Sequence, residues 1–227
     1  MTAFIFDIDG TIIDSMPAHE ASWSVFFGRR GRSLERAGFF HGTAGRTGVE
    51  LIREYFGPMS DAAAFTLVDE KESIYRERFG PVFREVDGFS AFATSAHAAG
   101  YRLACATAGD AGNVAFAMER LAVSHLFAAV VGGHEVAHGK PAPDLFLLAA
   151  QRMGAAPEEC IVFEDAPLGI EGARRAGMLA VALTTSASAA ELAAPHVIAA
   201  MADYRSADAV SIANLAAARR VQKGVLA

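Results

Sequence analysis

Two aspartates, Asp7 and Asp9, directly follow the apolar run at residues 3–6. Side chains two residues apart on an extended chain point to the same side, so both carboxylates can face one point just beyond the end of a strand. Carboxylates this close repel each other unless a cation or a shared proton lies between them, and Gly10 permits a tight turn after them. The spacing therefore predicts a catalytic or cation-binding pair. A plain polar turn and a calcium loop are the alternatives, but a calcium loop needs further acidic ligands where residues 11–13 read Thr-Ile-Ile.

A second acidic pair, Glu164 and Asp165, follows another apolar run at residues 160–163. Both pairs stand where a strand is expected to end, and open α/β folds bind ligands at the carboxyl ends of parallel strands. Oxygen ligands of this kind suit Mg²⁺, which binds few carboxylates and keeps waters and phosphate oxygens. Taken alone, an acidic pair is more often a charge at a helix N-terminus or a solvated turn.

Two weaker signals carry groups that could hold a phosphate. Thr107 and Ala108 follow the apolar run at residues 102–106, and a hydroxyl with free backbone N–H groups can bind phosphate oxygens. Lys140 stands between a glycine and a proline, before a predicted helix. Taken alone, Thr107 and Ala108 are ordinary residues for the end of a strand, and Lys140 is an ordinary surface charge. If all four elements converge, the four carboxylates contribute a charge of −4, and Mg²⁺ together with Lys140 contributes +3. The net charge of the site is then −1, and such a site can accept a phosphate dianion only when the metal is bound.

The elements that must position these groups alternate along the chain. Short apolar runs, interpreted as buried strands, are separated by segments whose apolar residues recur at helical spacing. This alternation predicts a parallel sheet covered by helices on both faces. In the stretch 16–84 we find no convincing strand and predict a helical insertion, and residues 208–227 are predicted to form a surface helix. The strands are expected at residues 3–6, 102–106, 128–131, 160–163, 179–183 and 197–199.

These four elements, in this order, resemble the four motifs of the haloacid dehalogenase superfamily. The matching strings are FDIDGTIIDS at residues 6–15, Thr107, GKPAPDLF at residues 139–146 and FEDAPLGI at residues 163–170. The resemblance covers almost the whole chain, because the helical stretch also looks like the four-helix cap of the family. It implies an α/β fold: a doubly wound, Rossmann-like parallel-sheet core of residues 1–15 and 85–227, and an inserted helical cap domain of residues 16–84.

The resemblance also implies a role for each motif residue. Asp7 would be the nucleophile that forms an aspartyl-phosphate, and Asp9 would be the general acid and then the general base. Mg²⁺ would bind the Asp7 carboxylate, the backbone carbonyl of Asp9 and the acidic pair at residues 164–165. Lys140 and Thr107 would hold the transferring oxygens, and Lys140 would also pair with Asp7.

The helical stretch resembles the cap of the β-phosphoglucomutase-like group, which includes sugar-phosphate and polyol-phosphate phosphatases. His19 and Trp23, four residues apart, match a His-x-x-x-Trp feature of that group. Arg46 lies in the expected specificity loop at residues 41–48 and could hold a distal anion or hydroxyl of a substrate. The alternatives are that Trp23 belongs to the cap core and that Arg46 is solvated.

The choice within the family rests on two residues. Haloacid dehalogenases and phosphonoacetaldehyde hydrolases lack the second aspartate that Asp9 supplies here. The mutase has polar and basic residues just after its second motif, where this chain has Asp110, whose carboxylate would repel a second phosphate. We therefore expect a Mg²⁺-dependent phosphatase of a small phosphomonoester such as a sugar or polyol phosphate. A β-phosphoglucomutase-type phosphomutase and a phosphoglycolate-type phosphatase are the alternatives.

Other classes of protein fit the sequence less well. A receiver domain phosphorylated on aspartate is about half this size and has no cap, and a dinucleotide-binding enzyme would have a Gly-x-Gly-x-x-Gly turn after its first strand. The formal charge of −6 does not favour binding to nucleic acid or to an anionic membrane. Two cysteines in apolar runs suggest buried free thiols. No basic leader or membrane-spanning run is apparent, so we expect a cytoplasmic monomer.

Overall fold

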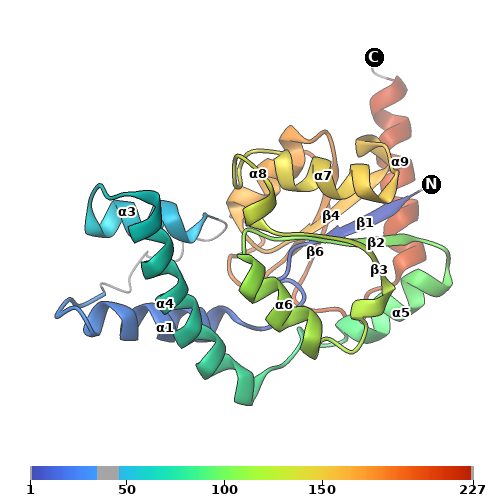
Figure 1. The fold of residues 1–227 in the computed structure, drawn as a ribbon. Coiled ribbons are helices and arrows are strands. Elements are labelled where there is room, and N and C mark those ends of the chain that lie inside the picture. The colour runs from blue at the N-terminus through green and yellow to red at the C-terminus, as the bar shows by residue number, and fades with distance from the viewer. Residues whose placement is uncertain (1, 35–45, 226–227) are drawn as a thin grey trace.

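The structure, a computed structural model, describes residues 2–34 and 46–225. Within these residues a six-stranded sheet has the strand order β3-β2-β1-β4-β5-β6, and every pairing is parallel (Figure 1). The parallel sheet predicted from the alternation is thus confirmed. The strands span Ala3–Phe6 (β1), Arg102–Ala106 (β2), Phe127–Val131 (β3), Cys160–Glu164 (β4), Leu179–Leu183 (β5) and Val197–Met201 (β6).

The order of the strands decides where a ligand can bind. β1 is central, and the chain adds β2 and β3 on one side of it before it crosses to β4 on the other side. A reversal of this kind opens a crevice at the carboxyl ends of the strands. Because β1 and β4 are neighbours in register, Phe6 beside Phe163, the two acidic pairs that follow them enter this crevice side by side.

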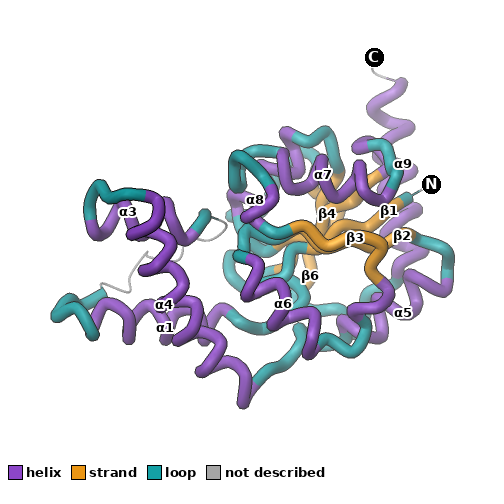
Figure 2. Tube along the Cα trace, viewed as in Figure 1, coloured by secondary structure: helices purple, strands orange, loops and turns teal. Residues whose placement is uncertain are grey.

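Helices cover both faces of the sheet, as predicted (Figure 2). One face is covered by α5 (Phe89–Ala98), α6 (Ala111–Arg120) and α9 (Ala209–Val225), and the other by α7 (Asp144–Met153) and α8 (Pro167–Arg175). Short 3₁₀ turns lie at Gly80–Val82, Ser124–Leu126, Gly133–Glu135 and Pro157–Glu159.

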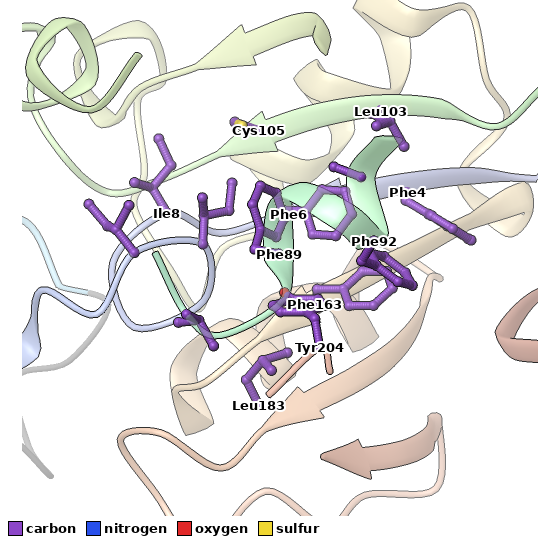
Figure 3. Close-up of a cluster of buried hydrophobic side chains, with 14 of the residues drawn as sticks. Phe4, Phe6, Ile8, Phe89, Phe92, Leu103, Cys105, Phe163, Leu183 and Tyr204 are labelled. Atoms are coloured by element: carbon purple, nitrogen blue, oxygen red, sulfur yellow. The ribbon is translucent and has the colours of Figure 1, made fainter. Parts of the chain in front are cut away.

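The two faces of the sheet carry side chains of different size, because alternate residues of a strand point to opposite faces. Toward α5 and α9 the strands present aromatic rings: Phe6 stacks on Phe163 with centroids 4.5 Å apart and meets Phe89 edge to face at 5.4 Å (Figure 3). Toward α7 and α8 they present small residues, such as Ala104 and Ala180, so these helices pack with little side chain between them and the sheet. The aromatic face anchors β1 and β4, which deliver the acidic pairs.

Between β1 and α5 the described parts of the chain form helices joined by loops and add no strand to the sheet. This stretch contains α1 (Met16–Gly28), α3 (Gly48–Phe56) and α4 (Asp61–Phe79), which lie beside the sheet domain at its left in Figure 1. These helices share a hydrophobic cluster of their own, built from Trp23, Phe26, Phe27, Leu51, Ile52, Ala64 and Ile74. The division into a core of residues 1–15 and 85–227 and a cap of residues 16–84 stays a prediction.

In the described parts of the chain, no helix combines the length and the apolar character that crossing a bilayer requires. The cytoplasmic location and the monomeric state expected from the sequence stay predictions.

Candidate active site

The loop after β1 is shaped by one glycine. Gly10 has a φ of +75°, and a Cβ atom there would lie 2.1 Å from Oδ2 of Asp165. The N–H groups of Ile12 and Ile13 both donate to the carbonyl of Ile8, which closes the loop into a tight turn. A side chain at position 10 would meet both a strained backbone and a carboxylate, so glycine lets the loop after β1 approach the end of β4.

Lys140 bridges the two strand ends. Its Nζ lies 2.5 Å from Oδ1 of Asp7 and also forms an ion pair with Oε1 of Glu164, and all three residues are buried. The other oxygen of Glu164 accepts the backbone N–H groups of residues 165 and 166 at 2.9 and 2.8 Å. The backbone at Gly169 packs directly against the carboxylate of Glu164, and an added Cβ there would lie 1.8 Å from that carboxylate. Both oxygens of Glu164 are therefore engaged within the protein.

Asp165 completes what we call the acidic site: Asp7, Lys140, Glu164 and Asp165. Its carboxylate accepts from the hydroxyls of Thr11 (3.3 Å) and Ser186. Burial and the neighbouring Glu164 raise the pKa of Asp165 to about 7. Burial also raises the pKa of Asp7 well above its usual range, although Lys140 opposes the shift.

The charges of the acidic site are unbalanced. With all three buried carboxylates ionised, they contribute −3 and Lys140 contributes +1, which leaves −2. Buried charges are normally paired, and a divalent cation among these oxygen donors would bring the sum to zero. Among the described residues no three His, Cys, Asp or Glu side chains already enclose one point as a complete metal cage. Mg²⁺ needs no such cage, because it usually binds one or two carboxylates and keeps waters or substrate oxygens.

Asp9 lies at the junction of the sheet and the helical stretch. Its Oδ1 receives three contacts, from Ser15 Oγ (2.7 Å), His19 Nε2 (3.1 Å) and Tyr75 OH (3.2 Å). The rings of His19 and Tyr75 are stacked, with centroids 3.8 Å apart. Burial alone would raise the pKa of Asp9, but the charge and hydrogen bond of His19 outweigh it and lower the pKa to about 2. Asp9 is thus a carboxylate at neutral pH.

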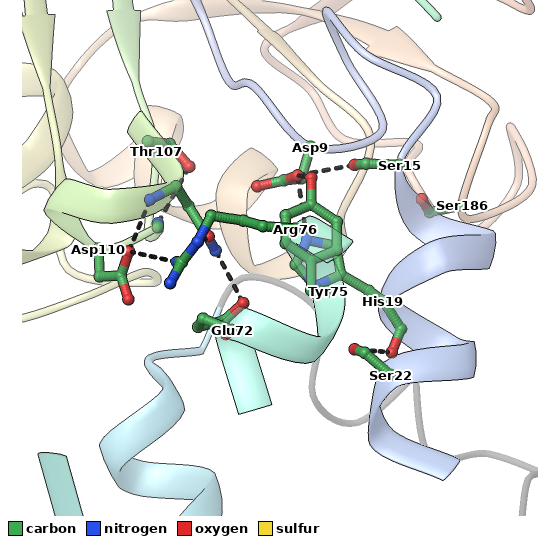
Figure 4. A network of polar contacts seen from close by, with 12 residues as sticks. Asp9, Ser15, His19, Ser22, Glu72, Tyr75, Arg76, Thr107, Asp110 and Ser186 are labelled. Atoms are coloured by element: carbon green, nitrogen blue, oxygen red, sulfur yellow. Dashed lines mark hydrogen bonds and ion pairs between the residues drawn. The ribbon is translucent and has the colours of Figure 1, made fainter. Parts of the chain in front are cut away.

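A chain of polar contacts continues from His19 across the helical stretch, and we call its members His19, Lys71, Glu72 and Asn113 the polar network. Figure 4 labels two of them, His19 and Glu72, together with Asp9 and Tyr75. Lys71 Nζ lies 2.9 Å from His19 Nδ1 and 3.0 Å from Glu72 Oε1. The other oxygen of Glu72 accepts from Asn113 Nδ2 at 2.8 Å. Since Lys71 and Glu72 belong to α4 and Asn113 to α6, the network joins the helical stretch to the sheet domain.

A cavity of about 620 Å³ lies between the acidic site and the polar network, and both groups line it. Thr107, buried, and Ala108 line the cavity at the end of β2, where Thr107 Oγ1 accepts the backbone N–H of Gly109 at 3.1 Å. Asp110 follows Gly109 and is the N-cap of α6, because its carboxylate accepts a hydrogen bond from the backbone N–H of Asn113 at 2.7 Å.

The three substrate residues expected from the helical stretch also line this cavity, in different settings. His19 contacts Asp9, and Trp23 is 4% exposed and belongs to the hydrophobic cluster of the helices. Arg46 is partly buried and forms an ion pair with Glu54 at 2.7 Å. It would have to break this ion pair to reach a substrate. Residues 41–45 of the expected specificity loop lie outside the described residues.

Several residues of the site were not foreseen. Tyr75, Lys71 and Glu72 stand on a helix whose charged residues look solvent-exposed in the sequence, and Asn113 follows a strand exit as an ordinary first-turn residue. The one available indication was that Lys71 and Glu72, which are adjacent and opposite in charge, stand next to the apolar residues of the 61–79 segment. Ser15 and Gly169 fall inside the matched motif strings, although no role was assigned to them.

Comparisons with known proteins identify the family and the fold. A family model for haloacid dehalogenase-like hydrolases matches residues 1–177. The chain is 34% identical over 193 residues to hexitol phosphatase A of Escherichia coli (strain K12), with 83% of this chain and 86% of that protein covered. It is 35% identical over 189 residues to fructose-1-phosphate phosphatase YqaB of the same organism, with 78% and 93% covered. A solved β-phosphoglucomutase from Clostridium difficile superposes on the chain with a TM-score of 0.85 and 20% sequence identity. The superposition covers 97% of this chain and 100% of that one and shows that the two proteins share a fold.

Proposed function

Since the chain belongs to the haloacid dehalogenase-like hydrolases, we propose that it is a Mg²⁺-dependent phosphatase that hydrolyses a small sugar or polyol phosphate through an aspartyl-phosphate on Asp7. The observation that carries the proposal is the convergence of Asp7, Thr107 and Lys140 on one cavity next to Asp9. A carboxylate nucleophile, a cation, a hydroxyl and a second carboxylate are the groups that phosphoryl transfer to and from an aspartate needs.

The reaction proceeds in two steps on these residues. Lys140 holds Oδ1 of Asp7, so Oδ2 attacks the phosphorus, the ester P–O bond breaks, and the leaving oxygen takes a proton from Asp9. Water then attacks the phosphorus and gives a proton to Asp9. The bond between phosphorus and Asp7 breaks in that second step, and phosphate leaves with both aspartates restored.

Asp9 has to change its protonation state between the steps. The contacts on its Oδ1 stabilise the carboxylate, which is the form that takes a proton from water in the second step. The first step needs the acid. We therefore expect the contacts from His19 and Ser15 to loosen when the leaving oxygen of a substrate comes next to Asp9.

Mg²⁺ fits the acidic site by charge and by ligand type. The proposed ligands are Asp7, the backbone carbonyl of Asp9, Asp165 and Glu164, all oxygen donors. Glu164 could join them only by giving up one of its present contacts with Lys140 or the backbone. Bound Mg²⁺ supplies the positive charge that offsets repulsion between the carboxylates and a phosphate dianion.

The nature of the substrate is supported by two observations. The two bacterial relatives named above act, by their names, on a hexitol phosphate and on fructose 1-phosphate. In addition, the carboxylate of Asp110 lines the cavity just beyond Thr107, where it would repel a second phosphate. A phosphomutase that must bind a bisphosphate is therefore less well supported than a phosphatase, and so is a phosphatase of phosphoglycolate, which carries a second anion.

The proposal is tested by measuring phosphate release from sugar, polyol, nucleotide and glycolate monophosphates, with Mg²⁺ and again with EDTA. We expect Mg²⁺-dependent release from sugar or polyol phosphates and none from the Asp7→Asn variant. Conversion of β-glucose 1-phosphate to glucose 6-phosphate in the presence of a trace of bisphosphate would instead identify a mutase. Release that persists in EDTA or in Asp7→Asn would contradict the proposed chemistry.

A further inference from the structure

The polar network contains a buried charge that the proposed reaction does not use. Glu72 on α4 is 8% exposed, and its neighbour Lys71 is 2% exposed. Lys71 is connected to the reacting groups through His19, which contacts Asp9. Glu72 touches neither Asp9 nor any residue of the acidic site among the contacts described, yet it lines the same cavity. Burying such a carboxylate costs stability unless its hydrogen-bonding and charged partners offset the loss of solvation.

The partners of Glu72 fix its orientation and its charge. Oε1 accepts from Lys71 and Oε2 from Asn113 Nδ2, at 3.0 and 2.8 Å. The amide of Asn113 is held from its other side, because its Oδ1 accepts from Arg76 at 2.9 Å. Burial alone would raise the pKa of Glu72, but Lys71, His19 and Asn113 hold it below its usual range. Glu72 therefore stands in the cavity wall as a fixed carboxylate.

The pair formed by Glu72 and Asn113 has hydrogen-bonding capacity left over. A carboxylate offers about four acceptor positions and a side-chain amide two N–H donors. The described contacts use two acceptor positions of Glu72 and one donor of Asn113. An acceptor thus lies beside a donor on the cavity wall, and this arrangement complements a hydroxyl group, which both donates and accepts.

We propose that Glu72, together with Asn113, is a specificity-determining pair that binds a hydroxyl group of the substrate beyond its phosphate. The inference rests on the proposed phosphatase function and narrows it to polyhydroxylated phosphomonoesters. A distal phosphate or carboxylate would meet repulsion from Glu72 and from Asp110, which lines the same cavity. A purely alkyl group would leave the remaining acceptor positions of Glu72 and the remaining N–H of Asn113 unpaired in a desolvated site.

A purely positioning role for Glu72 predicts a different result. If Glu72 only oriented Lys71 and, through it, His19 and Asp9, its removal would slow the reaction of every phosphomonoester by the same factor. A residue that binds a substrate hydroxyl affects only substrates that carry one. The two roles are therefore separated by a matched pair of substrates that differ in hydroxyl groups and share the type of leaving group, a primary alcohol.

Sorbitol 6-phosphate and n-hexyl phosphate form such a pair, since both are primary esters of a six-carbon chain. We expect Glu72→Gln to lower the ratio of their kcat/KM values, sorbitol 6-phosphate over n-hexyl phosphate, by about 10- to 100-fold, the usual range for a hydrogen bond to a charged group. The control is Glu77→Gln, the same change of charge on an exposed residue of the same helix, which should leave the ratio as it is. An equal loss on both substrates, or no loss on either, would overturn the proposal.

Binding measurements keep this inference separate from the proposed reaction. Calorimetric titration of Asp7→Asn with sorbitol 6-phosphate and Mg²⁺ measures affinity without turnover. We expect the dissociation constant to rise by about tenfold or more when Glu72→Gln is added. If wild type releases no phosphate but this rise occurs, the proposed function fails and the hydroxyl site stands. If wild type releases phosphate and the rise is absent, the hydroxyl site fails alone.

Discussion

The two charged regions that face each other across the cavity are built on opposite principles. The acidic site at the ends of β1 and β4 has three buried carboxylates for one lysine, and burial raises the pKa values of Asp7 and Asp165. The polar network of the helical stretch pairs Lys71 with Glu72, whose pKa lies below its usual range. The first region has a deficit of positive charge, and the second is balanced within itself.

The difference indicates what each region can receive. A site with excess buried carboxylate is stabilised by a cation and, with the cation bound, can accept a phosphate. A balanced network gains little from another ion, but its spare donors and acceptors can bind neutral hydroxyl groups. The cavity between them thus suits a molecule with one anionic end and one polar, uncharged end, which is the character of a sugar or polyol monophosphate.

The largest effect is expected from Asp7→Asn. The amide cannot attack phosphorus as a carboxylate does, so kcat for sugar-phosphate hydrolysis should fall by about 10⁴-fold or more, as losses of nucleophiles do. The same change removes a buried charge from a site that has too many. The melting temperature of the metal-free variant should therefore equal or exceed that of the wild type, and scanning calorimetry in EDTA checks this. A clear loss of stability would mean that the acidic site is balanced after all.

The second prediction concerns the dependence of stability on pH in the absence of metal. Asp165 has a pKa of about 7 in the folded protein against an ordinary value of 3.8, so the folded state binds its proton more tightly than the unfolded state does. Stability contributed by this group is then lost as pH rises from about 4 to 7, by an upper limit of about 4 kcal/mol. Asp165→Asn should remove this loss, as measured by urea unfolding in EDTA at pH 5 and pH 8.

Mg²⁺ should act on the same group. At a concentration 100 times its dissociation constant, a cation that binds only the folded state adds about 2.7 kcal/mol of stability. We expect Mg²⁺ to raise the melting temperature of wild type at pH 8 and to raise that of Asp165→Asn much less. An equal increase in both proteins would show that the cation binds elsewhere.

The third prediction tests whether the acidic site depends on backbone shape. A methyl group at Gly169 would overlap the carboxylate of Glu164, so Gly169→Ala should displace Glu164 and, with it, Lys140. A shift of about 1 Å in such groups can lower kcat/KM by about 10²-fold. The matched control is Gly177→Ala: an added Cβ there meets nothing within 4 Å, and its positive φ should cost stability without reaching the site. Unchanged activity in Gly169→Ala would show that Glu164 need not hold Lys140.

The fold and the acidic site could be predicted from the sequence because both depend on local patterns. Apolar runs followed directly by acidic residues mark buried strands that carry acidic side chains at their carboxyl ends, as with Asp7 and Glu164. Their convergence also follows from sequence, since parallel strands end at one edge of a sheet. The helices that cover each face could not be foreseen: which strand residues are aromatic is visible, but which helix they meet depends on the strand order.

The polar network could not be predicted, because its burial is produced by packing between distant elements. Lys71 and Glu72 are ordinary helix residues until α4 crosses α1, and Asn113 meets Glu72 only where α6 passes α4. In an isolated helix, each of these three side chains would be exposed to solvent, and nothing in the sequence would indicate a functional role. The same holds for Tyr75, whose hydroxyl reaches Asp9 from a position 66 residues away.

The fourth prediction tests the link between the two regions at His19. Replacement His19→Asn removes the main group that lowers the pKa of Asp9, so this pKa should rise from about 2 toward 3.8. An NMR titration of the aspartate carboxyl carbons measures the rise. The loss of one oriented contact should also reduce kcat by about tenfold. Tyr75→Phe, which removes a neutral donor from the same oxygen, should have a smaller effect, and a larger one would assign the orientation of Asp9 to Tyr75.

The smallest effect is expected from Arg46, which is one of the lining residues of the cavity. Because Arg46 pairs with Glu54 in a partly exposed position, the pair contributes no more than about 1 kcal/mol, and Arg46→Gln should change kcat/KM for a sugar monophosphate by about threefold or less. Glu54→Gln provides the opposite test, since it releases the guanidinium toward the cavity. If Arg46 served a distal anion, Glu54→Gln would improve the affinity for a bisphosphate while Arg46→Gln abolished it. If the cavity selects a neutral, hydroxylated end, as the balance of Lys71 and Glu72 indicates, neither variant will make a bisphosphate the better ligand.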